Sequence, residues 1–346
     1  MKIIIDINHP AHVHYFRNFF KIATNRGHDV LFVSRDKEIT HQLLKLYDIP
    51  YIGRGRGNEG KLGKLFYMLF ADWVLFKIAR KFKPDIFLNF LHPYPSQVAR
   101  LVGKPSFVFS DTEHARLHHK LTLPFATRVF TPSCYRIDLG AKQVRFNSYM
   151  ELSYLHPNYF KPDMDVLKLL GVGPDEKYVI VRFVSWAAAH DFGHTGMSLE
   201  NKRRAILEMS KYAKVFITSE SPLPEDLDPY RIHIPFDRIH DAIYYSHLLF
   251  GESATMASEA AMLGTPAIYL DDDGRGYTDD LEQKYGLVYN YSEAQSDQTA
   301  AIAKAVELLT NPESKSIAGQ SRTRLLEQCI DTTQFMADVV LGHSKL

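Results

Sequence analysis

The chain has 346 residues, of which 45% are hydrophobic and 23% are charged, and its formal net charge is +1. This length exceeds the size at which one hydrophobic core usually stops growing, so we expect two domains. No stretch reaches the roughly 18 uninterrupted apolar residues of a membrane span. The amino terminus fits neither a secretory signal nor a transit peptide, so we expect a cytoplasmic protein.

The charge is distributed unevenly along the chain. Residues 1–155 contain 23 Lys+Arg and 12 Asp+Glu, whereas residues 156–346 contain 18 and 28. We therefore expect the two halves to face different partners. Nucleic acid is excluded, because no DNA- or RNA-binding motif is present and the acidic second half would repel phosphates.

In chain order, near-continuous β-type runs alternate with helical patterns through the first half. This order predicts βα units on a parallel sheet that is buried on both faces. The predicted strands are residues 2–7, 29–34, 86–89, 106–109 and 128–131.

After a Pro- and aromatic-rich crossing at 154–165, a second series begins. Its predicted strands are residues 178–184, 214–218, 231–234, 248–251 and 267–270, and the closing helices are 297–309, 313–329 and 332–341. The chain is thus predicted to form two Rossmann-like, doubly wound domains facing a cleft, 1–155 and 156–346, with C-terminal helices closing the chain.

Ligands of open parallel sheets bind beyond the carboxyl ends of the strands, so the polar residues that follow each strand are the candidates for a site. In the first half these stretches are 8–14, 89–95 and 110–116, and in the second half they are 185–191, 219–222, 251–266 and 271–277.

The most informative stretch is "FGESATMASEAAMLGTPAIYL". A strand is predicted to end at Gly251, and the free N–H groups of the helix that follows favour an anion. Ser253, Ala254 and Thr255 would cradle phosphate there, and Glu259, one turn further on, would accept both hydroxyls of a ribose. The alternative is an ordinary helix cap with a solvated glutamate.

This stretch resembles the donor half of GT-B glycosyltransferases and of the nucleotide-sugar 2-epimerases that share their fold. Further motifs, "DINHPAHVHYFRN", "SDTEHA", "ITSE" and "IHDAIYY", extend the resemblance over nearly the whole chain. They resemble the domain-of-unknown-function family 354, predicted glycosyltransferases. The resemblance implies a GT-B fold, a nucleotide-diphosphate sugar as substrate, and neither cofactor nor bound metal.

For the second domain, the resemblance implies a set of donor-binding residues. Glu259 would hold the ribose, Arg182 the diphosphate together with His190, and Asp271 or Asp272 the sugar hydroxyls, although a structural turn explains the acidic loop equally well. The full donor set is Arg182, His190, Glu220, Ser253, Ala254, Thr255, Glu259, Asp271 and Asp272.

For the first domain, the resemblance implies that His12 takes the proton from the acceptor hydroxyl and that Asp111 orients it, with His14 as the substitute base. The alternatives are that these histidines cap the helix or, with His114, bind a metal. Glu113 of "TEHARL" matches the glutamate that works on the sugar ring in 2-epimerases, which keeps that chemistry open.

Residues 61–83 combine six Lys/Arg with one Asp and many large aromatic residues. They form either a buried helix with a basic end or an interfacial helix on anionic lipid, at the inner face of the membrane. The second interpretation would suit a lipid-linked acceptor.

Taken together, these patterns predict a metal-independent glycosyltransferase that moves a sugar, UDP-linked, to a polysaccharide or glycolipid acceptor. A UDP-N-acetylglucosamine 2-epimerase-like enzyme is the first alternative. A non-catalytic nucleotide-sugar binding protein is the second.

Overall fold

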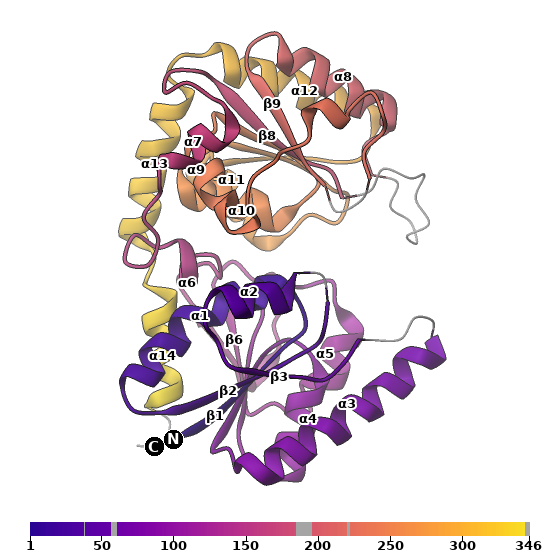
Figure 1. The fold of residues 1–346 in the computed structure, drawn as a ribbon, viewed down its shortest axis with the longest axis vertical. Coiled ribbons are helices and arrows are strands. Elements are labelled where there is room, and N and C mark those ends of the chain that lie inside the picture. Colours follow the sequence, from indigo (N-terminus) through magenta and orange to yellow (C-terminus); the bar gives the residue numbers. More distant parts are fainter. Residues whose placement is uncertain (38, 57–60, 185–195, 220–221, 343–346) are drawn as a thin grey trace. The chain divides into compact units, whose positions relative to one another are not determined.

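The computed structural model describes residues 1–37, 39–56, 61–184, 196–219 and 222–342. The chain divides into two compact units. Unit 1 comprises Met1–Tyr154 together with Cys329–Leu346, and unit 2 comprises Leu155–Gln328. Each unit contains one sheet in which every described strand pairing is parallel (Figure 1).

The sheet of unit 1 has the order β3-β2-β1-β4-β5-β6-β7. Its strands are β1 (Lys2–Ile7), β2 (Asp29–Ser34), β3 (Tyr51–Gly53), β4 (Ile86–Phe90), β5 (Ser106–Phe109), β6 (Arg128–Pro132) and β7 (Gln143–Phe146). The helices are α1 (Pro10–Asn25), α2 (Thr40–Leu46), α3 (Lys61–Phe82), α4 (Pro93–Leu101), α5 (Arg116–Thr122), α6 (Leu152–Leu155) and α14 (Thr332–Leu341).

The sheet of unit 2 has the order β12-β11-β10-β8-β9. Its strands are β8 (Tyr178–Arg182), β9 (Lys214–Thr218), β10 (Leu248–Gly251), β11 (Ala267–Leu270) and β12 (Val288–Tyr291). The helices are α7 (Asp165–Leu170), α8 (Leu199–Ser210), α9 (Ile239–Tyr245), α10 (Ala254–Leu263), α11 (Gly276–Tyr285), α12 (Gln295–Thr310) and α13 (Ser314–Gln328).

The central strands β1 and β4 are buried along most of their length because helices cover them. In unit 1, α3 and α4 bury Leu75 and Val98 against Ile4, Val33 and Phe87 of three neighbouring strands. In unit 2, residues of α8 and α12 share a core with β8, β9 and β10. This arrangement confirms the prediction of two parallel α/β domains.

The strand predictions hold except at the sheet edges. The missed strands β3, β7 and β12 are short edge strands, and their partly exposed residues give a weak apolar signal. The predicted strand 231–234 is wrong: only Arg231 makes an isolated bridge, to Ile217. The segment is too short and too exposed to extend the sheet.

The last helix belongs to unit 1, whereas the sequence assigned all of 156–346 to the second domain. Phe335 of α14 stacks on Phe146 of β7, with ring centroids 5.0 Å apart, and Thr333 Oγ1 donates to the Ser153 carbonyl at 2.6 Å. α14 also packs beside α1 (Figure 1). Its apolar face completes the core of unit 1, and a linear assignment of domains misses this return of the chain.

Among the described helices, none combines the length and apolar character that crossing a bilayer requires. The longest, α3, carries Lys77, Arg80 and Lys81 in its second half.

Candidate functional site

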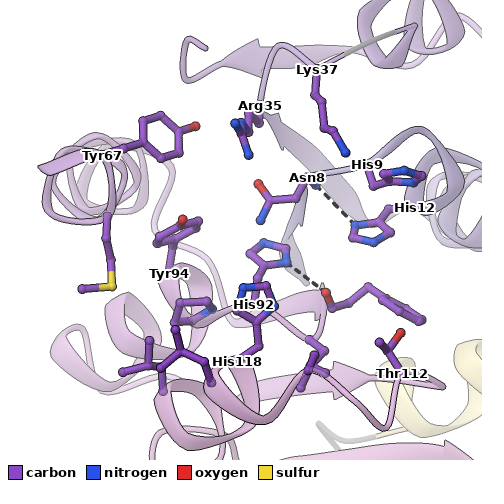
Figure 2. Close-up of a pocket in the computed structure, with 17 residues that line it drawn as sticks. Asn8, His9, His12, Arg35, Lys37, Tyr67, His92, Tyr94, Thr112 and His118 are labelled. Atoms are coloured by element: carbon purple, nitrogen blue, oxygen red, sulfur yellow. Dashed lines mark hydrogen bonds between the residues drawn. The ribbon is translucent and has the colours of Figure 1, made fainter. Parts of the chain in front are cut away.

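A pocket of about 890 Å³ opens in unit 1 beyond the carboxyl ends of β1, β2, β4 and β5 (Figure 2). This is the edge of the sheet at which parallel α/β folds bind ligands. The residues that line it are Asn8, His9, His12, Arg35, Lys37, Tyr67, Met68, Phe90, Leu91, His92, Pro93, Tyr94, Thr112, Ala115, Leu117, His118 and Leu121.

A buried ion pair underlies the pocket. Arg54, directly after β3, donates from Nε to Asp6 Oδ2 at 3.1 Å and from Nη2 to Asp6 Oδ1 at 3.0 Å, and both side chains are fully buried. The same guanidinium donates to the Tyr67 hydroxyl at 2.7 Å and to Asn8 Oδ1. Sequence reasoning missed this pair, although a carboxylate inside an otherwise apolar buried strand is a signal for it.

His92 is the second partner of Asp6. Its Nε2 lies 2.5 Å from Asp6 Oδ1, and its Nδ1 lies 3.0 Å from the Phe90 carbonyl oxygen, a bond drawn in Figure 2. His92 therefore joins the Asp6 carboxyl group of β1 to the backbone of β4 within the pocket wall.

His12 lies in the first turn of α1. Its ring stacks on that of His92, with centroids 6.1 Å apart, and lies tilted against that of Phe90, with centroids 4.9 Å apart. Burial lowers its pKa well below the usual value, and the nearby positive groups His9, His92, Lys37 and Arg54 lower it further. The ring is therefore neutral at pH 7.

The tautomer of His12 is indicated by the one ring hydrogen bond that it makes among the described residues. The Asn8 N–H donates to His12 Nδ1 at 3.3 Å, which leaves the ring hydrogen on Nε2 (Figure 2). In this form Nε2 donates to a ligand oxygen, and it accepts a proton only after the tautomer changes. The bond is longer than the usual 2.7–3.2 Å, so it restrains the tautomer weakly.

The predicted pairing of His12 with Asp111 is absent from the part of the chain that the structure describes. Asp111 is buried after β5, and its Oδ1 accepts from the Thr112 hydroxyl at 3.0 Å. Asp111 and His12 follow different strands, and the only described hydrogen bond of the His12 ring goes to Asn8 instead. The catalytic roles that the resemblance implies for His12 and Asp111 stay predictions.

Glu113 and His14, two further predicted catalytic residues, are not among the described residues that line the pocket. Glu113 Oε1 accepts from the Arg136 N–H at 2.9 Å. His14 Nδ1 lies 3.2 Å from Arg17 Nη1, and its ring contacts Tyr154. The i, i+2 spacing points His12 and His14 to different sides of α1.

The other roles considered for the histidine turn have different outcomes. His9 is the N-cap of α1, and its side chain accepts from the Ala11 N–H at 3.3 Å, which agrees with the capping alternative for that residue. A search for groups of three or more His, Cys, Asp or Glu arranged to hold a metal finds none within the described ranges.

In unit 2, the predicted phosphate turn lies at the start of α10. Ser253 is the N-cap, and its hydroxyl oxygen accepts from the Met256 N–H at 3.4 Å. Ala254 and Thr255 form the first turn. A side chain at Gly251 would place its Cβ 1.9 Å from the Arg182 carbonyl oxygen, so glycine allows β8 and β10 to approach here. The first N–H groups of a helix have no acceptor within the helix, so those of this turn suit an anion.

Glu259, the predicted ribose ligand, is buried on the same helix. Its Oε1 lies 2.9 Å from Nε2 of His240, at the start of α9. His240 lies in the motif "IHDAIYY", 19 positions before Glu259, but no role was predicted for it from the sequence. The pair fixes the Glu259 carboxylate in one orientation.

The remaining donor candidates have separate environments. Arg182 ends β8, and its Nη1 lies 3.5 Å from Thr218 Oγ1. Asp271 Oδ1 accepts from the N–H groups of Asp273 and Gly274 at 2.8 and 3.1 Å, and Asp272 Oδ1 accepts from the Glu293 N–H at 2.7 Å. The bonds of Asp271 are those of a structural turn, whereas the bond of Asp272 ties the loop to the segment after β12. His190 and Glu220 lie outside the described residues.

Glu252 is a carboxylate that the sequence did not single out. It directly follows β10 and accepts from the N–H groups of Val184 at 2.9 Å and Met197 at 2.7 Å, and from the buried Lys202 Nζ at 3.0 Å. Its place between Gly251 and Ser253, beside the predicted phosphate turn, was the available signal.

These two units, each with its polar residues at the carboxyl ends of parallel strands, define an α/β protein of the GT-B type, as predicted. The chain belongs to the family described as Protein of unknown function (DUF354), which matches residues 1–279. A relative in Methanocaldococcus jannaschii, Uncharacterized protein MJ0665, is 24% identical over 288 residues, which cover 78% of this chain and 81% of the relative.

Solved structures with the same fold include two kinds of enzyme. UDP-GlcNAc 2-epimerase from Neisseria meningitidis bound to UDP-GlcNAc matches with a TM-score of 0.66 and 15% identity, over 94% of this chain and 99% of that one. Spinosyn rhamnosyltransferase SpnG complexed with spinosyn aglycone matches with a TM-score of 0.62 and 12% identity, over 97% and 98%. At these identities the likeness establishes the fold.

Proposed function

We propose that the protein is a glycosyltransferase that moves a sugar from a nucleotide-diphosphate sugar, UDP-linked, to a glycan or lipid-linked acceptor in polysaccharide or glycolipid assembly. The observation that carries the proposal is the pocket of unit 1, where a neutral, buried imidazole, His12, lies at the carboxyl edge of the sheet. A neutral imidazole is a suitable base for an acceptor hydroxyl.

In the proposed reaction, the acceptor oxygen attacks C1 of the donor sugar, and the bond between C1 and the nucleotide diphosphate breaks. The leaving diphosphate keeps the electron pair, and the hydroxyl proton passes to His12. This step needs the tautomer in which Nε2 is unprotonated, and the long bond from Asn8 allows that change. No metal or cofactor is part of the proposal.

Unit 2 would bind the donor. The first turn of α10 offers N–H groups to the diphosphate, and Glu259, oriented by His240, would hold the ribose. Arg182, at the end of the neighbouring strand, would add charge to the diphosphate site.

A 2-epimerase is supported less well by this geometry. That alternative depended on Glu113, whose carboxylate accepts from the Arg136 backbone and is not among the described residues lining the pocket. A donor site without a catalytic pocket would fit a non-catalytic binding protein, which predicts binding without turnover.

The donor assignment is tested by calorimetric titration with UDP, GDP, CDP, dTDP and ADP and their common sugar conjugates. We expect one nucleotide to bind and the Glu259→Gln variant to lose that binding. Glu307→Gln is the matched control, because Glu307 is an exposed residue of unit 2 that pairs with Lys304. If no nucleotide binds, or if Glu259→Gln binds as the wild type does, the donor assignment is wrong.

The reaction is tested by following free nucleotide and sugar products with the nucleotide sugar that binds. We expect His12→Gln to reduce transfer about 10²- to 10⁴-fold, and His28→Gln, in the turn between α1 and β2, to leave it unchanged. Loss of activity in His14→Gln instead would make His14 the base. A sugar epimerised at C2 in the absence of an acceptor would establish the epimerase.

A further inference from the structure

The pocket of unit 1 is lined by positive and imidazole groups and by none that is acidic, as far as its described residues show. The polar groups of this kind are Arg35, Lys37, His9, His12, His92 and His118. Figure 2 shows Arg35 and Lys37 on the side of the pocket opposite His92 and His118. The carboxylate beneath them, Asp6, is already shared by Arg54 and His92. The pocket therefore favours an anionic ligand.

Arg35 is the strongest single indication that the pocket binds an anion. It follows β2, and its guanidinium makes no hydrogen bond or ion pair with any residue that the structure describes. Its one described contact is with the Tyr67 ring, 5.3 Å from the guanidinium carbon to the ring centroid, and its Nε is buried without an acceptor. The N–H groups of such a guanidinium can donate two parallel hydrogen bonds to the oxygens of a phosphate or diphosphate.

His12 reports the positive potential of the same space. Besides burial, every group that lowers its pKa is a cation or an imidazole: His9, His92, Lys37 and Arg54. These neighbours oppose the proton that the proposed reaction delivers to His12. An anion bound among them would offset that opposition and raise the pKa of His12.

The other part of the pocket is apolar. Met68 of α3, Leu91 and Pro93 after β4, and Leu117 and Leu121 of α5 line it. The volume, about 890 Å³, is near the upper end of the range for ligand pockets and far exceeds a phosphate ion. The complementary ligand carries an anionic group on an apolar body.

Helix α3, which forms one wall of the pocket, also carries apolar and basic side chains on its exposed side. α3 contributes Tyr67 and Met68 to the pocket, whereas its residues Leu69 and Trp73 are 59% and 54% exposed. Lys77 Nζ lies 3.5 Å from the centroid of the Trp73 ring. Exposed aromatic and basic side chains on one helix are typical of contact with anionic lipid.

We propose that the pocket of unit 1 binds the acceptor through a phosphate or diphosphate group joined to an apolar chain, with Arg35 as the main anion-binding residue and the apolar wall holding the chain. The identification of this ligand as the acceptor rests on the proposed glycosyltransferase function. The binding itself does not, because every residue that carries it lies in unit 1.

Binding is measured by calorimetry on the full chain without nucleotide sugar. The probes are farnesyl diphosphate, farnesol and inorganic diphosphate. We expect farnesyl diphosphate to bind at least about tenfold more tightly than farnesol, because farnesol lacks the charged hydrogen-bond acceptor. Equal binding of the two, or binding of neither, overturns the proposal. If inorganic diphosphate binds as tightly as the farnesyl ester, the phosphate site stands and the lipid source is wrong.

Two variants locate the binding. Arg35→Gln should weaken farnesyl diphosphate at least about tenfold with an unchanged melting temperature, since this side chain holds no described structural bond. Arg56→Gln is the matched control, an arginine of unit 1 that is exposed and paired with Asp36. His118→Gln, on the opposite wall, gives a second variant that should also weaken binding. Equal affinity in Arg35→Gln and wild type overturns the assignment of Arg35.

The ring of His12 supplies a readout that does not depend on activity. Its carbon-bound proton, assigned by comparison with His12→Gln, is titrated by NMR with and without inorganic diphosphate. We expect the anion to raise the pKa of His12, and an unchanged or lower pKa contradicts the proposal. UDP is the competitor: if it displaces farnesyl diphosphate, the pocket is a nucleotide site. Failure of the donor titration alone leaves this result in place.

Discussion

The Asp6→Asn substitution tests the ion pair beneath the pocket. Asp6 is fully buried and accepts from Arg54 through both oxygens and from His92 through Oδ1. An asparagine keeps the shape and one acceptor oxygen but leaves the buried Arg54 guanidinium without a counter-charge. Removing one partner of a buried pair in this way costs about 3–5 kcal/mol of unfolding free energy.

The chain offers a matched control in the same unit. Asp36 accepts from Arg56 Nε at 2.8 Å, and the Arg56 side chain is 85% exposed. Water screens such a pair, so we expect Asp36→Asn to leave the stability of unit 1 within experimental error. The two substitutions are chemically identical, and each removes a carboxylate that pairs with an arginine, buried for Asp6 and exposed for Asp36.

Urea unfolding, followed by circular dichroism and scanning calorimetry, measures both variants. The transition of unit 2 serves as an internal reference, because Asp6 and its partners all belong to unit 1. If Asp6→Asn shifts the unit 1 transition no more than Asp36→Asn does, the pair is not the electrostatic support of the pocket. A shift of both transitions would show that the units unfold together.

Two further predictions concern stability. Burial, followed by the nearby Asp6, raises the pKa of Asp72 to about 7, so folding takes up a proton between about pH 4 and pH 7. The stability of unit 1 should therefore fall as pH rises through that window. Asp72→Asn should remove this pH dependence in urea titrations, and an unchanged pH profile in the variant would contradict the prediction. Gly251→Ala should prevent β8 and β10 from pairing, because its Cβ would meet the Arg182 carbonyl oxygen at 1.9 Å. At Gly286 a Cβ has open space, so Gly286→Ala should cost only the strain of a left-handed backbone, about 1–2 kcal/mol. Similar melting temperatures for the two variants would refute the close approach of β8 and β10 at Gly251.

Several features of the candidate site were readable from the chain. Polar residues directly after apolar runs placed His12 at the pocket and Ser253 at the start of α10, because the carboxyl ends of parallel strands meet at one edge. The two-residue spacing of His12 and His14 also carried information. On a helix this spacing points the two side chains to different sides. Of the two, His12 lines the pocket and His14 is not among its described lining residues.

Other assignments stay predictions, because they depend on where side chains meet. Asp271 and Asp272 had equal support as sugar ligands and as turn residues, and in the structure their carboxylates accept backbone N–H groups. The pairing of His12 with Asp111 was carried over from related enzymes, and a hydrogen bond depends on side-chain positions that a motif does not specify. Local bonds of this kind become visible only in coordinates.

By itself, the sequence determined the alternation of strands and helices, the two parallel sheets and the edge at which each unit collects its polar residues, since these follow from local apolar patterning and the geometry of parallel strands. Only the tertiary structure decided which charges meet. Arg54 and His92 lie 48 and 86 positions from Asp6 along the chain, and they follow β3 and β4 whereas Asp6 lies within β1. The return of α14 to unit 1 was decided in the same way, because apolar surface is buried wherever a complementary face lies in space, whatever its distance in sequence.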